Sequence, residues 1–276
     1  MRTSGLDTED FAPSAPIAFD LPREGEQVCR INLAVPAGAP PAGGWPVIVL
    51  LDAAGCFGTC VEALGRMSRR SDATAVVPMV VVGVSAGRGE YDRARRQADF
   101  TSPVPDQPRA GGAAAFLRFL TDEVLPAVAA QAPIDRSRAT LFGHSLAGYF
   151  VLWVLANAPG TFRNHAAISP STWWDRTGLH AAIDRLPAGC AARALVCIGE
   201  WEDDLPPWQQ TTPGATEARA RRLARQMVPG ARAVAEALAQ VLGEAQVSFR
   251  LLAEEDHASI LSAAIPRALR LASLPA

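Results

Sequence analysis

The run ATLFGHSLAGYF at residues 139–150 decides the fold class of this chain. Residues 139–142 are mostly apolar, as in a strand whose two faces are both buried. Residues 146–158 remain apolar over the length of a helix. Between them a serine stands in a short turn flanked by small residues. A strand that turns sharply into a helix at such a serine is typical of enzymes that use the serine hydroxyl as a nucleophile.

The turn matches the motif G-x-S-x-G at Gly143, His144, Ser145 and Leu146, but Ala147 occupies the last glycine position. The neighbours of a strained turn must be small so that strand and helix can approach each other, and alanine is nearly as small as glycine. We therefore expect Ser145 to be a nucleophile. The alternative is a serine that begins an ordinary helix after a strand.

Outward from this turn, apolar runs alternate with helical patterns, which predicts an α/β fold with a mostly parallel sheet. The proline-rich and glycine-rich stretch at 36–46 predicts a hairpin connection. No linker separates two hydrophobic regions, so we expect one domain over residues 1–276, with 1–26 as a peripheral segment. Strands are expected at residues 28–35, 47–51, 79–84, 139–142, 165–168, 193–198 and 247–252. Helices are expected at 113–129, with a stop or kink at Pro126, and at 146–158, 216–226, 231–242 and 258–272. The arginines of 216–226 and 231–242 are expected to face solvent.

Composition narrows the class of protein. Of the 276 residues, 49% are hydrophobic and 20% charged, the profile of a globular protein. The net charge of −2 gives no field that would attract nucleic acid. Five cysteines show no metal-ligand spacing, so we expect no metal. Without a signal-peptide run near the start or a run of about 18 apolar residues, no membrane span and a cytoplasmic location are expected. The oligomeric state is left open.

The general base of a serine nucleophile should be one of four histidines. His144 lies inside the turn, where its side chain is expected to point away from its neighbour. His165 opens a predicted core strand, and His180 lies in a polar stretch. His257 follows the last predicted strand, and the carboxyl ends of strands are where such a sheet places reactive groups. We expect His257 to be the base; the alternative is a solvated surface histidine.

The acid should lie between the serine and the histidine in the chain. Residues 199–204 leave a predicted strand and hold four carboxylates. Glu202 is the first candidate and Asp203 the second, because a shift of one residue exchanges them. A serine–histidine pair without a working acid is also open. For the oxyanion hole we expect the backbone N–H groups of Leu146 and of Ala53 or Ala54, with Ala53 favoured.

Six segments of the chain carry a further signal together: residues 47–54, 96–103, 141–148, 169–174, 199–202 and 256–257. They occur in the order found in the bacterial putative-esterase family, which the chain resembles from about residue 31 to residue 271. This family includes the ferric-enterobactin and related trilactone siderophore esterases and is similar to esterase D. The resemblance implies an α/β-hydrolase fold with helices on both faces of the sheet, carboxylic ester hydrolysis, and no cofactor. It carries the nucleophile to Ser145 and the base to His257. Where relatives commonly have Asp-Gly, this chain has Asp52-Ala53.

The resemblance also places Arg96 near the active site, as a candidate for binding an anionic or catecholate substrate. The alternative is an ion pair with Asp99 or a loop cap. Trp173 and Trp174 are candidates for lining an aromatic pocket, with core packing as the alternative.

Together these features predict a serine esterase that works through an acyl-enzyme. The expected small-molecule substrate is a trilactone siderophore such as enterobactin, free or loaded with iron. The alternatives are a general small-ester or thioester hydrolase, an acyltransferase using the same serine, and an inactive binding module.

Overall fold

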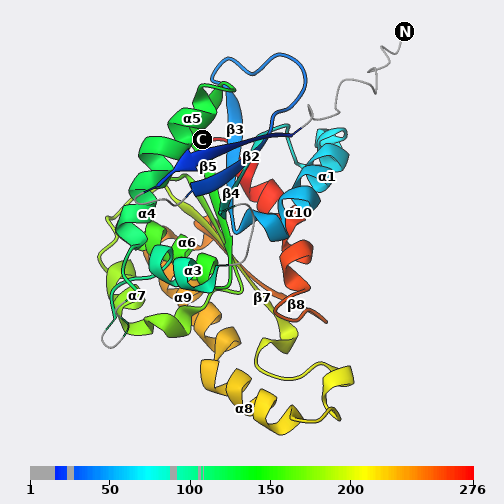
Figure 1. Cartoon of the computed structure of the whole chain (residues 1–276), viewed down its shortest axis with the longest axis vertical. Coiled ribbons are helices and arrows are strands. Elements are labelled where there is room, and N and C mark those ends of the chain that lie inside the picture. The colour runs from blue at the N-terminus through cyan, green and yellow to red at the C-terminus, as the bar shows by residue number, and fades with distance from the viewer. Residues whose placement is uncertain (1–15, 24–27, 88–91, 105–106, 108) are drawn as a thin grey trace.

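The centre of the molecule is an eight-stranded sheet in the order β1-β2-β4-β3-β5-β6-β7-β8 (Figure 1). The structure is a computed structural model, and it describes residues 16–23, 28–87, 92–104, 107 and 109–276. Strands β3 to β8 run parallel to one another, and β2 runs antiparallel to both of its neighbours, β1 at the sheet edge and β4. The strands are β1 Ile17–Pro22, β2 Val28–Ala34, β3 Trp45–Leu51, β4 Val80–Ala86, β5 Ile134–His144, β6 Asn164–Ile168, β7 Arg193–Gly199 and β8 Val247–Leu252.

All seven predicted strands are present, and the predicted α/β class with a mostly parallel sheet is confirmed. β5 starts at Ile134, earlier than expected. This part of the strand was missed because residues 135–138 are polar and show no buried strand pattern. The eighth strand, β1, lies in the segment predicted as peripheral and pairs with β2 at the sheet edge. Residues 1–15 and 24–26 of that segment lie outside the described residues.

The predicted hairpin at residues 36–46 is wrong. β2 pairs with β4, and β4 separates it from β3 in the sheet. The reason lies in burial: every residue of β3 is buried, so β3 needs a strand on each side, and β4 and β5 supply them. β2 alternates between buried and half-buried residues, which suits a strand near the edge.

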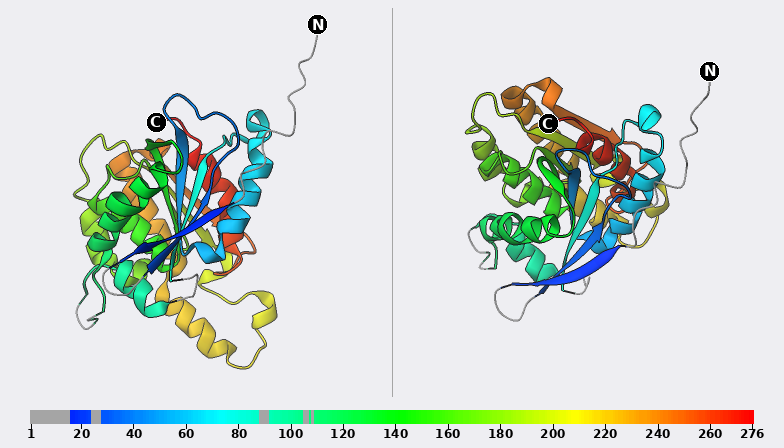
Figure 2. Two further views of the ribbon diagram at one scale, coloured as in Figure 1. Left: turned by 45° about the horizontal axis from the view of Figure 1, so that its top comes forward. Right: turned by 90° about the horizontal axis from the view of Figure 1, so that it is seen from above.

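Two hydrophobic layers cover the sheet, one on each face. Alternate residues of β3 separate them: Val47, Val49 and Leu51 pack into the first layer, Ile48 and Leu50 into the second. Helices α4, α6, α7 and α9 cover the first face, and α1 and α10 cover the second, as Figures 1 and 2 show. The helices are α1 Phe57–Ser68, α2 Ser71–Thr74, α3 Arg93–Asp99, α4 Ala113–Phe119, α5 Leu125–Ala129, α6 Leu146–Asn157, α7 Arg176–Ile183, α8 Ala215–Arg225, α9 Met227–Leu242 and α10 Ile260–Ala272.

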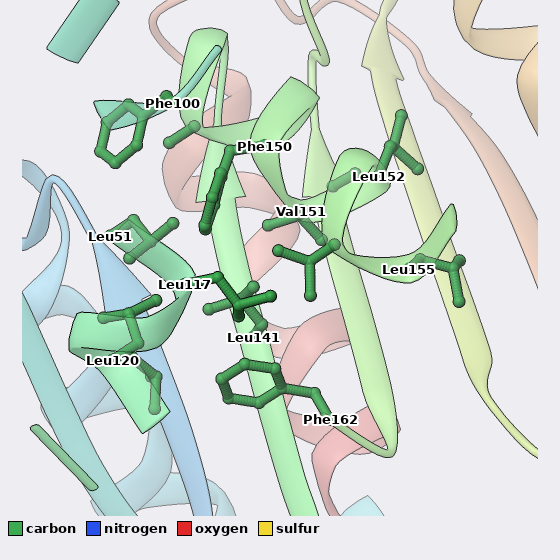
Figure 3. Close-up of a cluster of buried hydrophobic side chains, with 14 of the residues drawn as sticks. Leu51, Phe100, Leu117, Leu120, Leu141, Phe150, Val151, Leu152, Leu155 and Phe162 are labelled. Atoms are coloured by element: carbon green, nitrogen blue, oxygen red, sulfur yellow. The ribbon is translucent and has the colours of Figure 1, made fainter. Parts of the chain in front are cut away.

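Helix α6 is held against the sheet by the first layer, and this fixes the turn that precedes it. Phe150 contacts the rings of Phe100 and Phe116, and Leu141 of β5 lies below them in Figure 3. Because α6 is apolar on nearly all sides and buried, its position is set by packing on several neighbours at once.

The predicted helix at 113–129 is present, with an irregularity where Pro126 was expected to cause one. A π-helical turn, Leu120–Val124, joins α4 to α5. Proline lacks an N–H and its ring collides with the carbonyl four residues earlier in a regular helix, and the wider turn just before it relieves both problems.

The parallel strands end at one edge of the sheet, and the loops after β3, β5, β6, β7 and β8 meet there. This is the edge at which open α/β sheets bind their ligands. Helix α8 projects from the body near this edge, and it has no buried residue (Figure 1). None of the helices in the described part of the chain has both the length and the apolar character required to cross a membrane.

Candidate active site

Three side chains from distant parts of the sequence form a hydrogen-bonded row at this edge. His257 Nε2 lies 3.0 Å from Ser145 Oγ, and His257 Nδ1 lies 2.7 Å from Glu202 Oε2. The carboxylate of Glu202 can only accept, so Nδ1 carries the ring proton and Nε2 is left to accept from the serine hydroxyl. The side chain of Glu202 is 2% exposed and that of His257 44%. In this geometry the imidazole can take the serine proton while the carboxylate orients and stabilises the resulting cation.

The backbone at Ser145 is strained. Its φ of 60° and ψ of −118° lie outside the regions that L-residues favour. The Ser145 N–H donates to the Ile168 carbonyl at 2.9 Å, which ties the turn to the end of β6. A Cβ on Gly143 would stand 2.4 Å from the carbonyl oxygen of Ala147, so only glycine fits at that position. The strain projects the hydroxyl from the sheet edge, as in a nucleophile elbow.

Glu202 and its neighbour Asp203 make different contacts. The Asp203 carboxylate accepts from the backbone N–H groups of Met227 at 2.7 Å and Val228 at 3.3 Å, at the start of α9. It therefore caps a helix, while Glu202 contacts His257. Of the two acids predicted from the sequence, the structure brings the first to the histidine.

The loop after β6 contacts two members of the row. The Ser169 hydroxyl donates to Glu202 Oε1, the oxygen that His257 does not use. Ser171 Oγ lies 3.5 Å from Ser145 Oγ, and the Ser171 N–H donates to the Ser145 carbonyl at 3.0 Å. No role was predicted for these two serines. Their position could have indicated one, because they follow a predicted strand whose carboxyl end lies at this edge of the sheet.

The ring of His144 lies against that of His257, with centroids 4.7 Å apart. Burial, and then the positive charge that His257 can carry, lower the pKa of His144 to about 3. It therefore stays neutral beside His257 at ordinary pH. His165 is fully buried in β6, as its position in a predicted core strand indicated. His180 lies in α7.

Two backbone N–H groups lie near Ser145 by sequence and register. Leu146 begins α6 and follows the serine directly. Leu50 of β3 pairs with Phe142 of β5, so Ala53 comes three residues after one partner and Ser145 three residues after the other. The N–H of Ala54, the alternative to Ala53 as an oxyanion-hole donor, already donates to Ser85 Oγ at 3.2 Å.

A cleft of about 570 Å³ opens at Ser145 and His257. Three tryptophans and four arginines line it, together with Glu202, the one carboxylate among its described lining residues. A cavity with aromatic walls and more arginines than carboxylates suits an aromatic or anionic ligand. The tryptophans and arginines are Trp173, Trp174, Trp201, Arg93, Arg96, Arg222 and Arg225.

Trp173 and Trp174 both lie in the cleft wall, as the sequence predicted, and neither is fully buried. The guanidinium of Arg225 lies 5.4 Å from the centre of the Trp173 ring. Arg222 donates to the Trp201 carbonyl at 2.9 Å. The arginines of α8 were predicted to face solvent. Arg225 is exposed as predicted while it lines the open cleft, whereas Arg222 is half-buried in the cleft wall.

Arg96 lines the cleft, and its guanidinium also forms an ion pair with Asp52. Its Nε donates to Asp52 Oδ2 at 2.7 Å. The predicted alternative, an ion pair with Asp99, is wrong: Asp99 accepts from Arg23 at 2.5 Å and lies 3.5 Å from Arg95. Sequence separation explains the miss, since Asp52 and Arg96 are 44 residues apart in the chain and only the tertiary structure brings their side chains together.

Within the described residues, no group of three or more histidine, cysteine, aspartate or glutamate side chains is placed to hold a metal ion. The cysteines among them are free, and all but Cys190 are buried.

Comparison with known proteins gives one family. The family model described as "Putative esterase" matches residues 25–237. The ferri-bacillibactin esterase BesA of Bacillus subtilis is 32% identical, over 99% of this chain and 95% of its own length. The siderophore triacetylfusarinine C esterase of Aspergillus fumigatus is 31% identical, over 83% of this chain and 82% of its own.

Solved structures agree on the fold. The BES protein of Bacillus cereus superposes with a TM-score of 0.78 at 26% identity, covering 100% of this chain and 99% of its own. The siderophore hydrolase EstB of Aspergillus nidulans gives a TM-score of 0.80 at 24% identity, with the same coverage.

Proposed function

We propose a function for this chain, which belongs to the Putative esterase family and is a carboxylic ester hydrolase. It cleaves the ester bonds of a siderophore by a serine mechanism. The observation that carries the serine mechanism is the row from Ser145 Oγ through the His257 ring to Glu202, with contacts of 3.0 and 2.7 Å. Such a row activates a hydroxyl that is otherwise a weak nucleophile.

The first half of the reaction acylates the serine. His257 Nε2 takes the proton of Ser145 as Oγ bonds to the ester carbonyl carbon. The N–H groups of Leu146 and Ala53 stabilise the negative oxygen that forms, with the amino end of α6 adding a favourable dipole. When the tetrahedral intermediate collapses, His257 returns the proton to the departing alkoxide. The alcohol leaves, and the acyl group stays on Ser145.

The second half regenerates the enzyme. His257 takes a proton from a water molecule, whose oxygen attacks the acyl carbon of the ester on Ser145. The same two N–H groups hold the second oxyanion. Collapse returns the proton to Ser145 Oγ and releases the carboxylic acid. Glu202 accepts from Nδ1 throughout and keeps the ring in the orientation that both steps require.

The substrate proposal is a trilactone siderophore in its iron-loaded form. A ferric tris-catecholate complex is an anion with aromatic faces, and the cleft offers four arginines and three tryptophans. The relative BesA acts on ferri-bacillibactin by its name, and other relatives are named for enterobactin and salmochelin. A general small-ester hydrolase would need neither the charge nor the width of this cleft.

The first experiment tests the nucleophile. A fluorophosphonate probe should label the wild-type protein and Ser137→Ala, but not Ser145→Ala; Ser137 is a control serine exposed on β5, the strand that precedes Ser145. Turnover of p-nitrophenyl butyrate should fall on the order of 10⁴- to 10⁶-fold in Ser145→Ala. Equal labelling of all three proteins would overturn the serine mechanism.

The second experiment tests the substrate. Wild-type protein is incubated with ferric and with iron-free enterobactin, and linear fragments are followed by chromatography. We expect cleavage of both, with the higher kcat/KM for the ferric form. Good turnover of the butyrate ester without cleavage of either siderophore would instead support a general esterase.

A further inference from the structure

We propose that the Arg96–Asp52 ion pair holds the loop that supplies the second oxyanion-hole N–H, so that Arg96 is a positioning residue for every ester, charged or neutral. The inference rests on the proposed serine mechanism and goes beyond it, because it assigns Arg96 a task other than binding the charge of a substrate.

The loop begins with a strained residue. Asp52 follows β3 directly and has φ 51° and ψ 42°, in the left-handed region. Aspartate tolerates this region better than most residues but still at a cost, so the surroundings must hold it there. The next residue, Ala53, is fully buried and begins a 3₁₀ turn, Ala53–Gly55. The conformation of Asp52 therefore sets the direction of the peptide N–H of Ala53.

The Arg96 side chain is the cation that holds Asp52. Nε of Arg96 donates to Asp52 Oδ2 at 2.7 Å, and the side chains are 9% and 28% exposed. The guanidinium also lies 5.8 Å from the centre of the Phe100 ring, which itself packs in the first hydrophobic layer. α3 thus braces Asp52 from a fixed position. A buried charged pair of this kind is costly to break from one side, because the remaining charge has lost its partner.

The far side of the loop is held independently. The Ala54 N–H donates to Ser85 Oγ at 3.2 Å, and the Cys56 N–H donates to the Ala53 carbonyl at 3.0 Å. These contacts fix the turn after Ala53. The carbonyl of the Asp52–Ala53 peptide accepts from the Gly55 N–H at 3.2 Å, and the Arg96 side chain holds the side chain of Asp52. Loss of Arg96 should therefore leave this peptide with less restraint, so that the Ala53 N–H can turn away while the rest of the turn stays in place.

The test compares Arg96→Gln, Arg96→Lys and Asp52→Asn on p-nitrophenyl butyrate, which carries no charge for an arginine to bind. Arg70→Gln is the control, because Arg70 forms an exposed pair with Asp72 far from the cleft. We expect Arg96→Gln and Asp52→Asn to lower kcat by up to about 10²-fold, the effect of losing one oxyanion donor, with KM changed less than about twofold. Arg96→Lys should restore part of the loss, since an ammonium can still donate to Asp52.

Two further measurements separate this role from a general loss of structure. Phenylboronic acid adds to a serine hydroxyl to give a tetrahedral adduct whose oxygen needs the oxyanion hole, so its inhibition constant should rise in parallel with the fall in kcat. The double variant Arg96→Gln/Asp52→Asn should be no slower than the slower single variant, because both changes break one pair. Arg96→Lys serves as the folded reference if Arg96→Gln does not fold.

Outcomes for this inference and for the proposed function are distinct. If the wild-type protein is active and Arg96→Gln hydrolyses the neutral ester equally well, the inference alone is overturned. If Arg96→Gln loses activity only on ferric enterobactin, Arg96 binds the substrate and does not position the loop. A wild-type protein that neither labels with the fluorophosphonate probe nor hydrolyses the neutral ester would overturn both.

Discussion

The Ser169 hydroxyl donates a hydrogen bond to the Glu202 carboxylate, on the oxygen opposite the one that His257 uses. Both residues are almost fully buried. The oxygens of a buried carboxylate need hydrogen-bond donors, and here the imidazole contacts one oxygen and the Ser169 hydroxyl donates to the other. Ser169 therefore supports the residue that we propose as the catalytic acid.

We predict that removing the Ser169 hydroxyl slows hydrolysis about 10- to 100-fold, since a hydrogen bond to a charged group contributes about 1.5–3 kcal/mol. Ser169 has a φ of 43°, so Ser169→Gly removes the hydroxyl at a backbone angle that glycine accepts, while Ser169→Ala keeps the strain. Both variants should lose activity on p-nitrophenyl butyrate, and the alanine variant should melt at the lower temperature. Wild-type kcat in Ser169→Gly would show that the hydroxyl plays no part.

Glu202 and Asp203 should respond differently to substitution. Glu202→Gln should lower kcat on the order of 10⁴-fold, because an amide no longer stabilises the imidazole cation. Asp203→Ala should keep kcat and instead lose about 1 kcal/mol of stability, because two N–H groups at the start of α9 lose their acceptor. Steady-state kinetics and urea unfolding of both variants check this. The reverse pattern would make Asp203 the acid.

Arg225 should matter more for an anionic siderophore than for a neutral ester. Its guanidinium lies over Trp173 at the cleft, and a partly exposed ionic contact contributes about 1 kcal/mol. Arg225→Gln should therefore raise KM for ferric enterobactin several-fold, and added salt should reduce the difference. Arg219→Gln is the matched control, because Arg219 lies on the same helix and pairs with Asp204 outside the cleft. Equal effects of the two variants would argue against a specific contact.

Acid should destabilise the fold through His165. Burial lowers the pKa of this histidine to about 4, whereas in an unfolded chain it is about 6.5. As the pH falls from about 6.5 toward 4, the unfolded chain takes up a proton that the native state refuses, so the free energy of unfolding decreases by up to about 1.4 kcal/mol per pH unit. Urea unfolding of wild type and His165→Leu at about pH 7.5 and about pH 5 measures this decrease in the free energy of unfolding. The variant should lose less stability between these values, and parallel losses would contradict the assignment.

Gly143→Ala should damage the elbow, because its Cβ would meet the Ala147 carbonyl oxygen at 2.4 Å. Overpacking of this kind costs about 1–3 kcal/mol and shifts the backbone that carries Ser145. Gly160→Ala is the control, since a Cβ there meets nothing within 4 Å. We expect a lower melting temperature and lower kcat for the first variant and wild-type values for the second.

Much of this architecture follows from local patterns. The apolar, β-branched runs predicted seven strands, because strands buried on both faces admit few other residues. The turn at Ser145 was recognisable because its requirement for small neighbours is local. The position of His257 after the last strand predicted that it, among four histidines, would lie near Ser145, since parallel strands place their carboxyl ends at one edge.

Contacts between distant segments needed the tertiary structure. Glu202 and Asp203 are adjacent carboxylates, and only the path of the loop after β7 decides that the first meets His257 while the second caps α9. The ion-pair partner of Arg96 shows the same limit: the alternative prediction was the nearby Asp99, whereas the structure brings Asp52, just after β3, to the guanidinium. The order of β2, β4 and β3 likewise depends on which strands need a neighbouring strand on each side in the sheet.

The sequence by itself predicted seven of the eight strands, the class of fold and the two side chains that we propose to react, because hydrophobic period and turn sterics act over a few neighbouring residues. The tertiary structure identified the proposed acid, the contacts that Ser169 and Arg96 make beside the site, and the arginines that line the cleft. Those choices depend on distances between segments that are far apart in the chain, such as Ser169 and Glu202 with a separation of 33 and Glu202 and His257 with a separation of 55. No local pattern encodes such a distance, because it results from the packing of the whole sheet and its helices.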